Sequence, residues 1–207
     1  MTPHELLLAV NAHQGTFICS QINNSQVTKI VHFKHEVTPP AGTTDDLPDI
    51  GGLRDFYAVF GSITFYVDNQ SEDAARYIGT PDEWAELEDG FLVWLEHLDD
   101  DEREEYLPEW IDTCLVIGEE PETGNYILMP TEGPEAGAIY HFEHDGFEFD
   151  RHAPDLLKYT ADLLDLDDRN LSFIATHMRF VEGKDYHTQW WIEELRDNRG
   201  NYAKTKD

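Results

Sequence analysis

The chain has 207 residues, 40% of them hydrophobic and 12% aromatic, which is enough for one well-buried domain and too apolar for a disordered chain. It carries 14 Lys and Arg against 43 Asp and Glu, a formal net charge of −29. A field of that sign repels nucleic acids and anionic membranes and attracts basic proteins. The composition therefore predicts no nucleic-acid partner and no membrane partner, and it favours a protein partner.

The negative charge is unevenly distributed along the chain. Residues 1–168 contain 7 basic and 37 acidic residues, whereas residues 169–207 contain 7 basic and 6 acidic residues. The apolar runs are too short to span a bilayer, and the N-terminus lacks the basic region of a signal peptide. Cys19 and Cys114 form no metal or redox motif, so we expect a reduced, cytoplasmic protein without a cofactor.

The first part of the chain predicts an N-terminal extension over residues 1–44. A short helix begins it, and residues 26–33 alternate between polar and apolar side chains, which predicts a strand. Residues 38–49 are rich in proline and predict a loop. The sequence does not define this region further.

A short helix and a strand follow directly. Four apolar residues recur at helical spacing, namely Leu53, Phe56, Tyr57 and Phe60. Gly61 comes next and suits a left-handed C-terminal cap. Residues 62–68 then have the composition of a strand.

The clearest helix is predicted over residues 81–98. Thr80 and Glu83 have the spacing of a capping box, with Pro81 at the first helical position. One face carries the apolar residues Trp84, Leu87, Phe91, Trp94, Leu95 and Leu98, which we interpret as core packing. Residues 82–109 contain 13 Asp and Glu and a single basic residue, Arg103. The densest acidic run, 99–105, is expected to lie in a turn after the helix.

Residues 111–150 predict four consecutive antiparallel strands. Runs of β-branched and aromatic residues are separated by clusters of Gly and Pro, and the last separation is Asp145-Gly146. We expect this meander to form the centre of the sheet. A helix beginning near Pro154 follows it.

The last part, 166–207, predicts a C-terminal extension. Residues 171–180 suit either a helix or a strand. Residues 189–196, a turn at 197–200 and residues 201–203 suggest a hairpin packed on the core. Trp190 and Trp191 are expected to pack in the core or on a sheet face, with an exposed binding contact as the alternative.

The order of these elements resembles the SUKH superfamily, which groups bacterial immunity proteins with fungal regulators of cell-wall synthesis. The resemblance covers about residues 45–165. It rests on the segments 60–68, 115–118, 124–129, 137–146 and 153–154 and on the acidic helix between the first two.

The resemblance implies an α+β domain with a central antiparallel sheet flanked by helices, here a single domain with N- and C-terminal extensions. It also implies a non-enzymatic module that binds and neutralises a toxin, often a nuclease. The superfamily has no catalytic residues to carry over. A regulatory or scaffold protein with a cellular partner is the alternative on the same fold.

An acidic binding surface agrees with that expectation. A nuclease holds polyphosphate in a basic groove, and a concentrated negative field is attracted to such a groove. A merely solvated helix face is the competing explanation. The predicted contact residues are Glu88, Asp89, Asp99, Asp100, Asp101, Glu102, Glu104 and Glu105.

The histidines suggest a third function class, a metal-dependent hydrolase. His141 and Glu143 share one face of a strand, but His144 lies at a turn and points elsewhere. A complete site therefore needs a distant ligand such as His152 or His97. We predict no metal site and no catalytic residue. Cys114, in an apolar strand, is expected to be an inert buried thiol.

Overall fold

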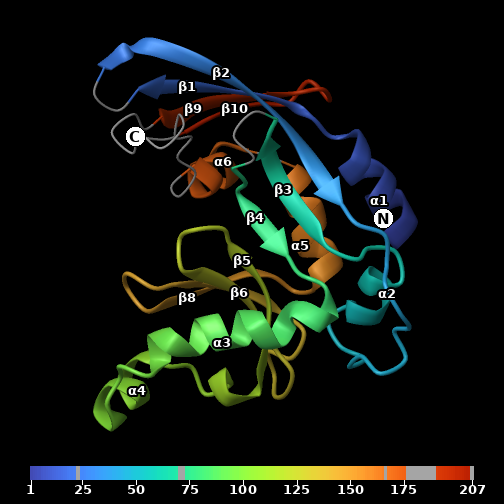
Figure 1. Ribbon diagram of the computed structural model, residues 1–207, viewed down its shortest axis with the longest axis vertical. Helices are drawn as coiled ribbons and strands as arrows, with labels where there is room; N and C mark the ends of the chain where they lie inside the picture. The colour runs from blue at the N-terminus through green and yellow to red at the C-terminus, as the bar shows by residue number, and fades with distance from the viewer. Residues whose placement is uncertain (22–23, 70–72, 166, 176–189, 206–207) are drawn as a thin grey trace.

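The computed structural model describes residues 1–21, 24–69, 73–165, 167–175 and 190–205. In these residues ten strands form one open antiparallel sheet, and six α-helices pack around it (Figure 1). The predicted class, α+β with an antiparallel sheet and flanking helices, is confirmed at this level. The molecule contains more strand than the sequence suggested.

The strands account for most of the architecture. They are β1 (Gly15–Gln21), β2 (Asn24–Val37), β3 (Ile63–Asp68), β4 (Arg76–Ile78), β5 (Cys114–Glu120), β6 (Asn125–Pro130), β7 (Ile139–Glu143), β8 (Glu148–Ala153), β9 (Trp190–Asp197) and β10 (Tyr202–Lys204).

The helices are short, and two of them are single 3₁₀ turns. They are α1 (Pro3–Ala12), α2 (Leu53–Tyr57), η1 (Pro81–Glu83), α3 (Trp84–Leu95), α4 (Asp100–Tyr106), η2 (Ile111–Thr113), α5 (Leu156–Leu164) and α6 (Asp168–Ala175). Within the described ranges, no helix has the length and apolar character needed to cross a membrane.

The sheet follows the chain almost in order, as β10-β9-β1-β2-β3-β4-β5-β6-β7-β8. The predicted four-stranded meander is present as β5 to β8, but its expected central position is wrong. Strand β8 is an edge strand, and β3 and β4 are the middle pair. The reason is that the strands from the two terminal segments, β1, β2, β9 and β10, all lie on the β4 side of the meander.

Both terminal extensions contribute strands to the same sheet. The strand expected at 26–33 lies within β2, and the predicted terminal hairpin is present as β9 and β10. Strand β9 pairs with β1, so that Gly15 lies opposite Asp197. The sequence did not predict β1 or β4. Residues 171–175 belong to α6, whereas 176–180 lie outside the described residues.

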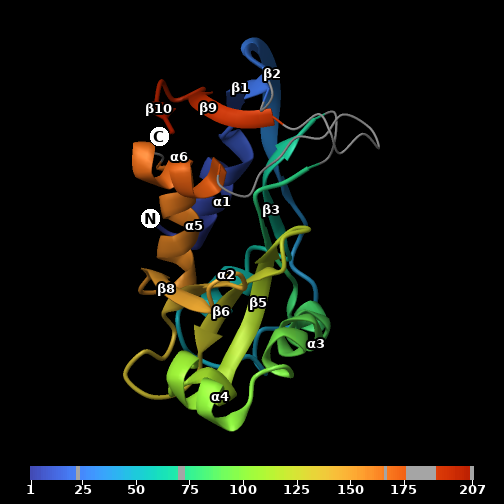
Figure 2. The same ribbon diagram turned by 90° about the vertical axis from the view of Figure 1, so that its left-hand side faces the viewer.

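Two apolar clusters lie on opposite faces of the sheet around β5 and β6. Val116 and Leu128 face α3, whereas Ile117 and Ile127 belong to the larger cluster that includes α2 and α5. Figure 2 shows α3 on one side of these strands and α5 on the other. Because both faces are covered, every residue of β6 is buried.

Gly61 has a different role from the one expected. Its φ is not positive, so the predicted left-handed cap is wrong. A Cβ atom at Gly61 would lie 2.3 Å from the carbonyl oxygen of Pro39 and 2.6 Å from Oγ1 of Thr38. Glycine is therefore needed here because the backbone of residues 38–39 passes so closely.

Two buried histidines connect distant parts of the chain by hydrogen bonds. Nε2 of His13 lies 3.1 Å from a carboxylate oxygen of Asp197, and its Nδ1 lies 2.8 Å from Nε2 of His35. The backbone N–H of Tyr66 donates to Nδ1 of His35 at 3.0 Å. That last bond fixes the direction of the others, since His35 must then donate to His13, and His13 to Asp197. Tyr66 has a φ of 58°, a strained value for a tyrosine inside a strand.

The histidine chain predicts a specific loss of stability in acid. Burial, with the nearby charges of His13 and Arg199, lowers the pKa of His35 to about 3, so the unfolded chain binds more protons between pH 6.5 and 3. Stability from this group is complete above pH 6.5 and falls as the pH falls. His35→Gln removes the titration but keeps a donor toward His13. The stability advantage of the wild type over the variant should shrink by about 1 to 2 kcal/mol between pH 7 and pH 5.

Urea unfolding at the two pH values measures this difference. Comparison with the variant cancels the general effect of protonating the many carboxylates. An advantage that is the same at both pH values would show that His35 titrates equally in the folded and unfolded chains.

Candidate functional site

The helix predicted over 81–98 is present as η1 followed by α3. The Thr80 backbone N–H donates to Oε2 of Glu83 at 2.7 Å, which completes the predicted capping box. Pro81 lies at the start of the helix, as expected. The first turn is therefore held by its own sequence and not only by tertiary packing.

The predicted apolar stripe fixes the position of α3 on the sheet. Leu87, Phe91 and Leu95 are buried, and Phe91 makes edge-to-face ring contacts with Tyr126 and Phe142. Ring centroids lie 5.7 Å and 5.1 Å apart in these two pairs. This packing directs the opposite side of α3 toward solvent.

The densest acidic run forms a helix, not the expected turn. Residues 100–106 are α4, and Asp99 is its N-cap. Oδ1 of Asp99 accepts a hydrogen bond from the Glu102 backbone N–H at 2.9 Å, and the Glu102 carboxylate accepts one from the Asp99 backbone N–H at 3.0 Å. Asp99 and Glu102 have the Asp-x-x-Glu spacing of a capping box, but this pattern was not recognised within the dense run of acidic residues.

All eight predicted contact residues are exposed. Asp99 and Glu102 use their carboxylates for the α4 cap, so they serve the fold. The other six have no ion-pair partner in the described chain; these are Glu88, Asp89, Asp100, Asp101, Glu104 and Glu105. Arg103 is directed to other groups: its Nη1 donates to the Leu95 carbonyl oxygen at 3.2 Å, and its Nη2 lies 4.0 Å from Oδ1 of Asp112.

Exposed apolar residues accompany the acidic ones, and the sequence analysis did not single them out. Leu92 is 42% exposed, Val93 is 53% exposed, and Tyr106 on α4 is 45% exposed. On α3, Leu92 follows Glu88 by four residues and Val93 follows Asp89 by four, so each apolar side chain adjoins a carboxylate. The sequence could have indicated Leu92 and Val93, because both are apolar residues of the predicted helix that lie outside its buried stripe.

We call this surface the acidic face, defined by Glu88, Asp89, Leu92 and Val93 on α3 and by Asp100, Asp101, Glu104 and Glu105 on α4. Figure 1 shows the two helices at one end of the molecule, away from the β9–β10 hairpin. Unpaired carboxylates supply long-range attraction for a cation-rich partner. The apolar side chains supply contact area that becomes favourable once water is excluded.

The histidines of the hydrolase hypothesis lie in separate places, and His97 is exposed just after the end of α3. His141 is buried, with Nε2 2.7 Å from the Tyr159 hydroxyl and its ring centroid 4.1 Å from that of His152. His144 lies at the β7–β8 turn and packs against Trp94, with ring centroids 4.3 Å apart. Among the residues with described positions, no three His, Cys, Asp or Glu side chains converge to hold a metal ion.

The polar residues near His144 instead support α3. Nη2 of Arg76 lies 2.6 Å from Oε1 of Glu120, and both side chains are almost fully buried. Asn125 donates to the other Glu120 oxygen at 3.0 Å and accepts from the His144 backbone N–H at 3.1 Å. The contact between His144 and Trp94 completes a connection from the middle of the sheet to the helix.

The cysteines are poor nucleophiles, and of the paired tryptophans only Trp190 packs in the core of the described chain. Cys19 and Cys114 are both free thiols, and burial raises the pKa of each to about 12, which makes them poor nucleophiles at neutral pH. Trp190 is buried, and Trp191, on the opposite face of β9, is 38% exposed.

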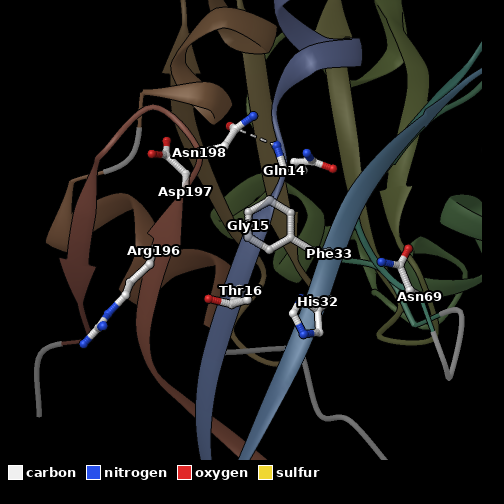
Figure 3. Close-up of a pocket in the computed structure, with 9 residues that line it drawn as sticks. All are labelled: Gln14, Gly15, Thr16, His32, Phe33, Asn69, Arg196, Asp197 and Asn198. Atoms are coloured by element: carbon white, nitrogen blue, oxygen red, sulfur yellow. Dashed lines mark hydrogen bonds between the residues drawn. The ribbon is translucent and has the colours of Figure 1, made fainter.

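A depression lies where β1, β2 and β9 are adjacent (Figure 3). Three of its polar residues already serve the fold. Asp197 bonds to His13, the Arg196 guanidinium contacts Glu194, and Asn198 accepts from the Gln14 backbone N–H at 3.3 Å. We therefore do not place the functional site there.

Comparison with known proteins gives no match to a protein family model, a curated protein or a solved structure. The resemblance to the SUKH superfamily accordingly stays a prediction.

The α4 cap makes the first prediction for the acidic face. Asp99→Ala removes the N-cap acceptor and should destabilise α4 by about 1 kcal/mol. Hydrogen exchange of the backbone N–H groups of residues 102–105 should then accelerate about fivefold. Asp101→Ala is the matched control, since it removes an exposed carboxylate from the same turn without touching the cap. Equal exchange rates in the two variants would contradict the capping role of Asp99.

Proposed function

We propose that the chain is a protein-binding module that holds a basic partner on its acidic face. The observation that carries this proposal is the presence of solvent-exposed Leu92 and Val93 among carboxylates that have no neutralising partner. A face used only for solubility gains nothing from exposed aliphatic side chains.

Charge and apolar contact contribute to binding in different ways. Unpaired surface charges mainly raise the association rate and select partners of opposite sign. Buried apolar contacts mainly slow dissociation. The acidic face contains both, and its partner should therefore present basic residues around an apolar contact region.

The resemblance to the SUKH superfamily suggests what such a partner does. We propose that it is a basic toxin, such as a nuclease domain, whose activity is blocked when its cationic groove is covered. The acidic face supports this proposal through its sign of charge. We propose no catalytic role for any residue of the chain.

The charge contribution is tested with five substitutions that spare the α4 cap. These are Glu88→Gln, Asp100→Asn, Asp101→Asn, Glu104→Gln and Glu105→Gln. With the partner recovered from the source organism and identified, the association rate constant at low salt should fall about tenfold or more. Added salt should slow wild-type association and affect the variant much less.

The control for that variant neutralises five exposed acids elsewhere, namely Asp45, Asp46, Asp49, Asp55 and Glu132. It changes the net charge equally, so a similar loss in both variants would assign the effect to net charge alone. An unchanged rate in the first variant would refute the acidic face as the contact surface.

The apolar contribution is tested by Leu92→Ser together with Val93→Ser. The dissociation rate constant should rise about tenfold with a nearly unchanged association rate constant, because the lost contacts form only in the bound state. Leu8→Ser, at a 70% exposed position of α1, is the control. Surface plasmon resonance separates the two rate constants, and unchanged dissociation in the double variant would remove α3 from the interface.

A further inference from the structure

A pocket of about 280 Å³ lies between α3 and the sheet. Its lining residues come from η1, from the first turn of α3 and from strands β4, β5 and β6. They are Tyr77, Glu83, Glu86, Leu87, Glu119 and Tyr126. The volume is slightly below the usual range for small-molecule sites, so it suits a single side chain better than a whole cofactor.

The floor of the pocket is a row of three residues across neighbouring strands. Glu119 on β5 lies directly opposite Tyr77 on β4 and directly opposite Tyr126 on β6. Directly paired residues point to the same face of a sheet, with Cβ atoms about 5 Å apart. The Glu119 carboxylate is therefore flanked by a phenol ring on each side.

Two further carboxylates approach from the helix side. The Glu83 carboxylate already has hydrogen-bond partners. Both of its oxygens lie 2.8 Å from the Tyr77 hydroxyl, and the Thr80 backbone N–H donates to it as well. Glu86 and Glu119 have no hydrogen bond or ion pair within the described chain. The pocket thus brings three negative charges together without a cation.

The surroundings of Glu119 disfavour its ionised form. Burial raises its pKa, and the negative charges of Glu86 and Glu83 raise it further. The folded protein accordingly holds the ionised Glu119 at a cost in free energy. Such a cost is typical of sites whose ligand supplies the missing charge.

We propose that this pocket binds a guanidinium group, supplied by an arginine side chain of the basic partner. The proposal rests on the proposed function and makes the pocket a specific anchor beside the acidic face. A guanidinium is planar, pairs with carboxylates through two parallel hydrogen bonds and stacks on aromatic rings. Glu119 offers the carboxylate, and Tyr77 and Tyr126 offer the rings. An ammonium group is a compact point charge and uses this geometry less well.

Three amino-acid amides serve as probes for the isolated protein. N-acetyl-arginine amide should bind with a dissociation constant on the order of 1 mM, and NMR should show the ring protons of Tyr77 and Tyr126 shifting as it binds. N-acetyl-citrulline amide, a neutral analogue of nearly the same shape, should bind at least about tenfold more weakly. Equal binding of citrulline would overturn the requirement for charge. Equal binding of N-acetyl-lysine amide would overturn the preference for a guanidinium.

The matching variant is Glu119→Gln, with Glu132→Gln on the β6–β7 connection as its control. Glu119→Gln should weaken arginine amide binding about tenfold or more, and the control should leave binding unchanged. Folding is checked by thermal unfolding at pH 7. The variant should melt at the same temperature as the wild type or higher, because the neutral amide removes the repulsion between Glu119 and the other two carboxylates.

If Glu119→Gln melts at a lower temperature than the wild type, Glu86→Gln is tested as well, because it changes only the helix side of the pocket. Unchanged arginine amide binding in both variants would refute the pocket. This test is independent of the test of the proposed function. The α3–α4 charge variant can lose partner association whether or not the pocket binds arginine amide.

Discussion

The buried ion pair between Arg76 and Glu120 is the interaction that joins the middle of the sheet to α3, whose apolar stripe packs on the neighbouring strands. The two side chains are 0% and 2% exposed, so neither charge is stabilised by water. Removing one partner of such a pair costs about 3–5 kcal/mol, because the other charge is left buried alone. Through Asn125 and His144 the pair is connected to Trp94 of α3. Loss of either charge at the middle of the sheet would therefore also disturb α3 and, with it, the acidic face.

The local features of the fold could be predicted from the sequence. The glycine and proline clusters of 111–150 separate the four strands, because these residues set the turn geometry wherever they occur. The start of α3 followed from Thr80 and Glu83, and its buried face followed from residues such as Phe91 and Leu95. In each case the determining contacts lie within a few residues along the chain.

The features that depend on distant segments could not be predicted. Strand β4 has three residues and includes the fully buried Arg76, whose charge is paired with Glu120 on the neighbouring strand β5. The pocket under α3 depends on the pairing of Glu119 with two tyrosines on different strands. The acidic residues were predicted as a surface, and the spacing of Asp99 and Glu102 already indicated a cap. That the other six lack an ion-pair partner among the described residues could be seen only in the structure.

The pairing of β1 with β9 has a consequence for the order of folding. His13 and Asp197, which meet at this junction, are 184 residues apart along the chain. Contacts of such high sequence separation slow folding, since a very long loop must close before they contribute. During synthesis, β1 can pair with β2 early, but its other edge has no partner until residues 190–197 emerge. An unpaired edge of this kind is open to strands of other chains, so the nascent protein is most exposed to misassembly at its N-terminal hairpin.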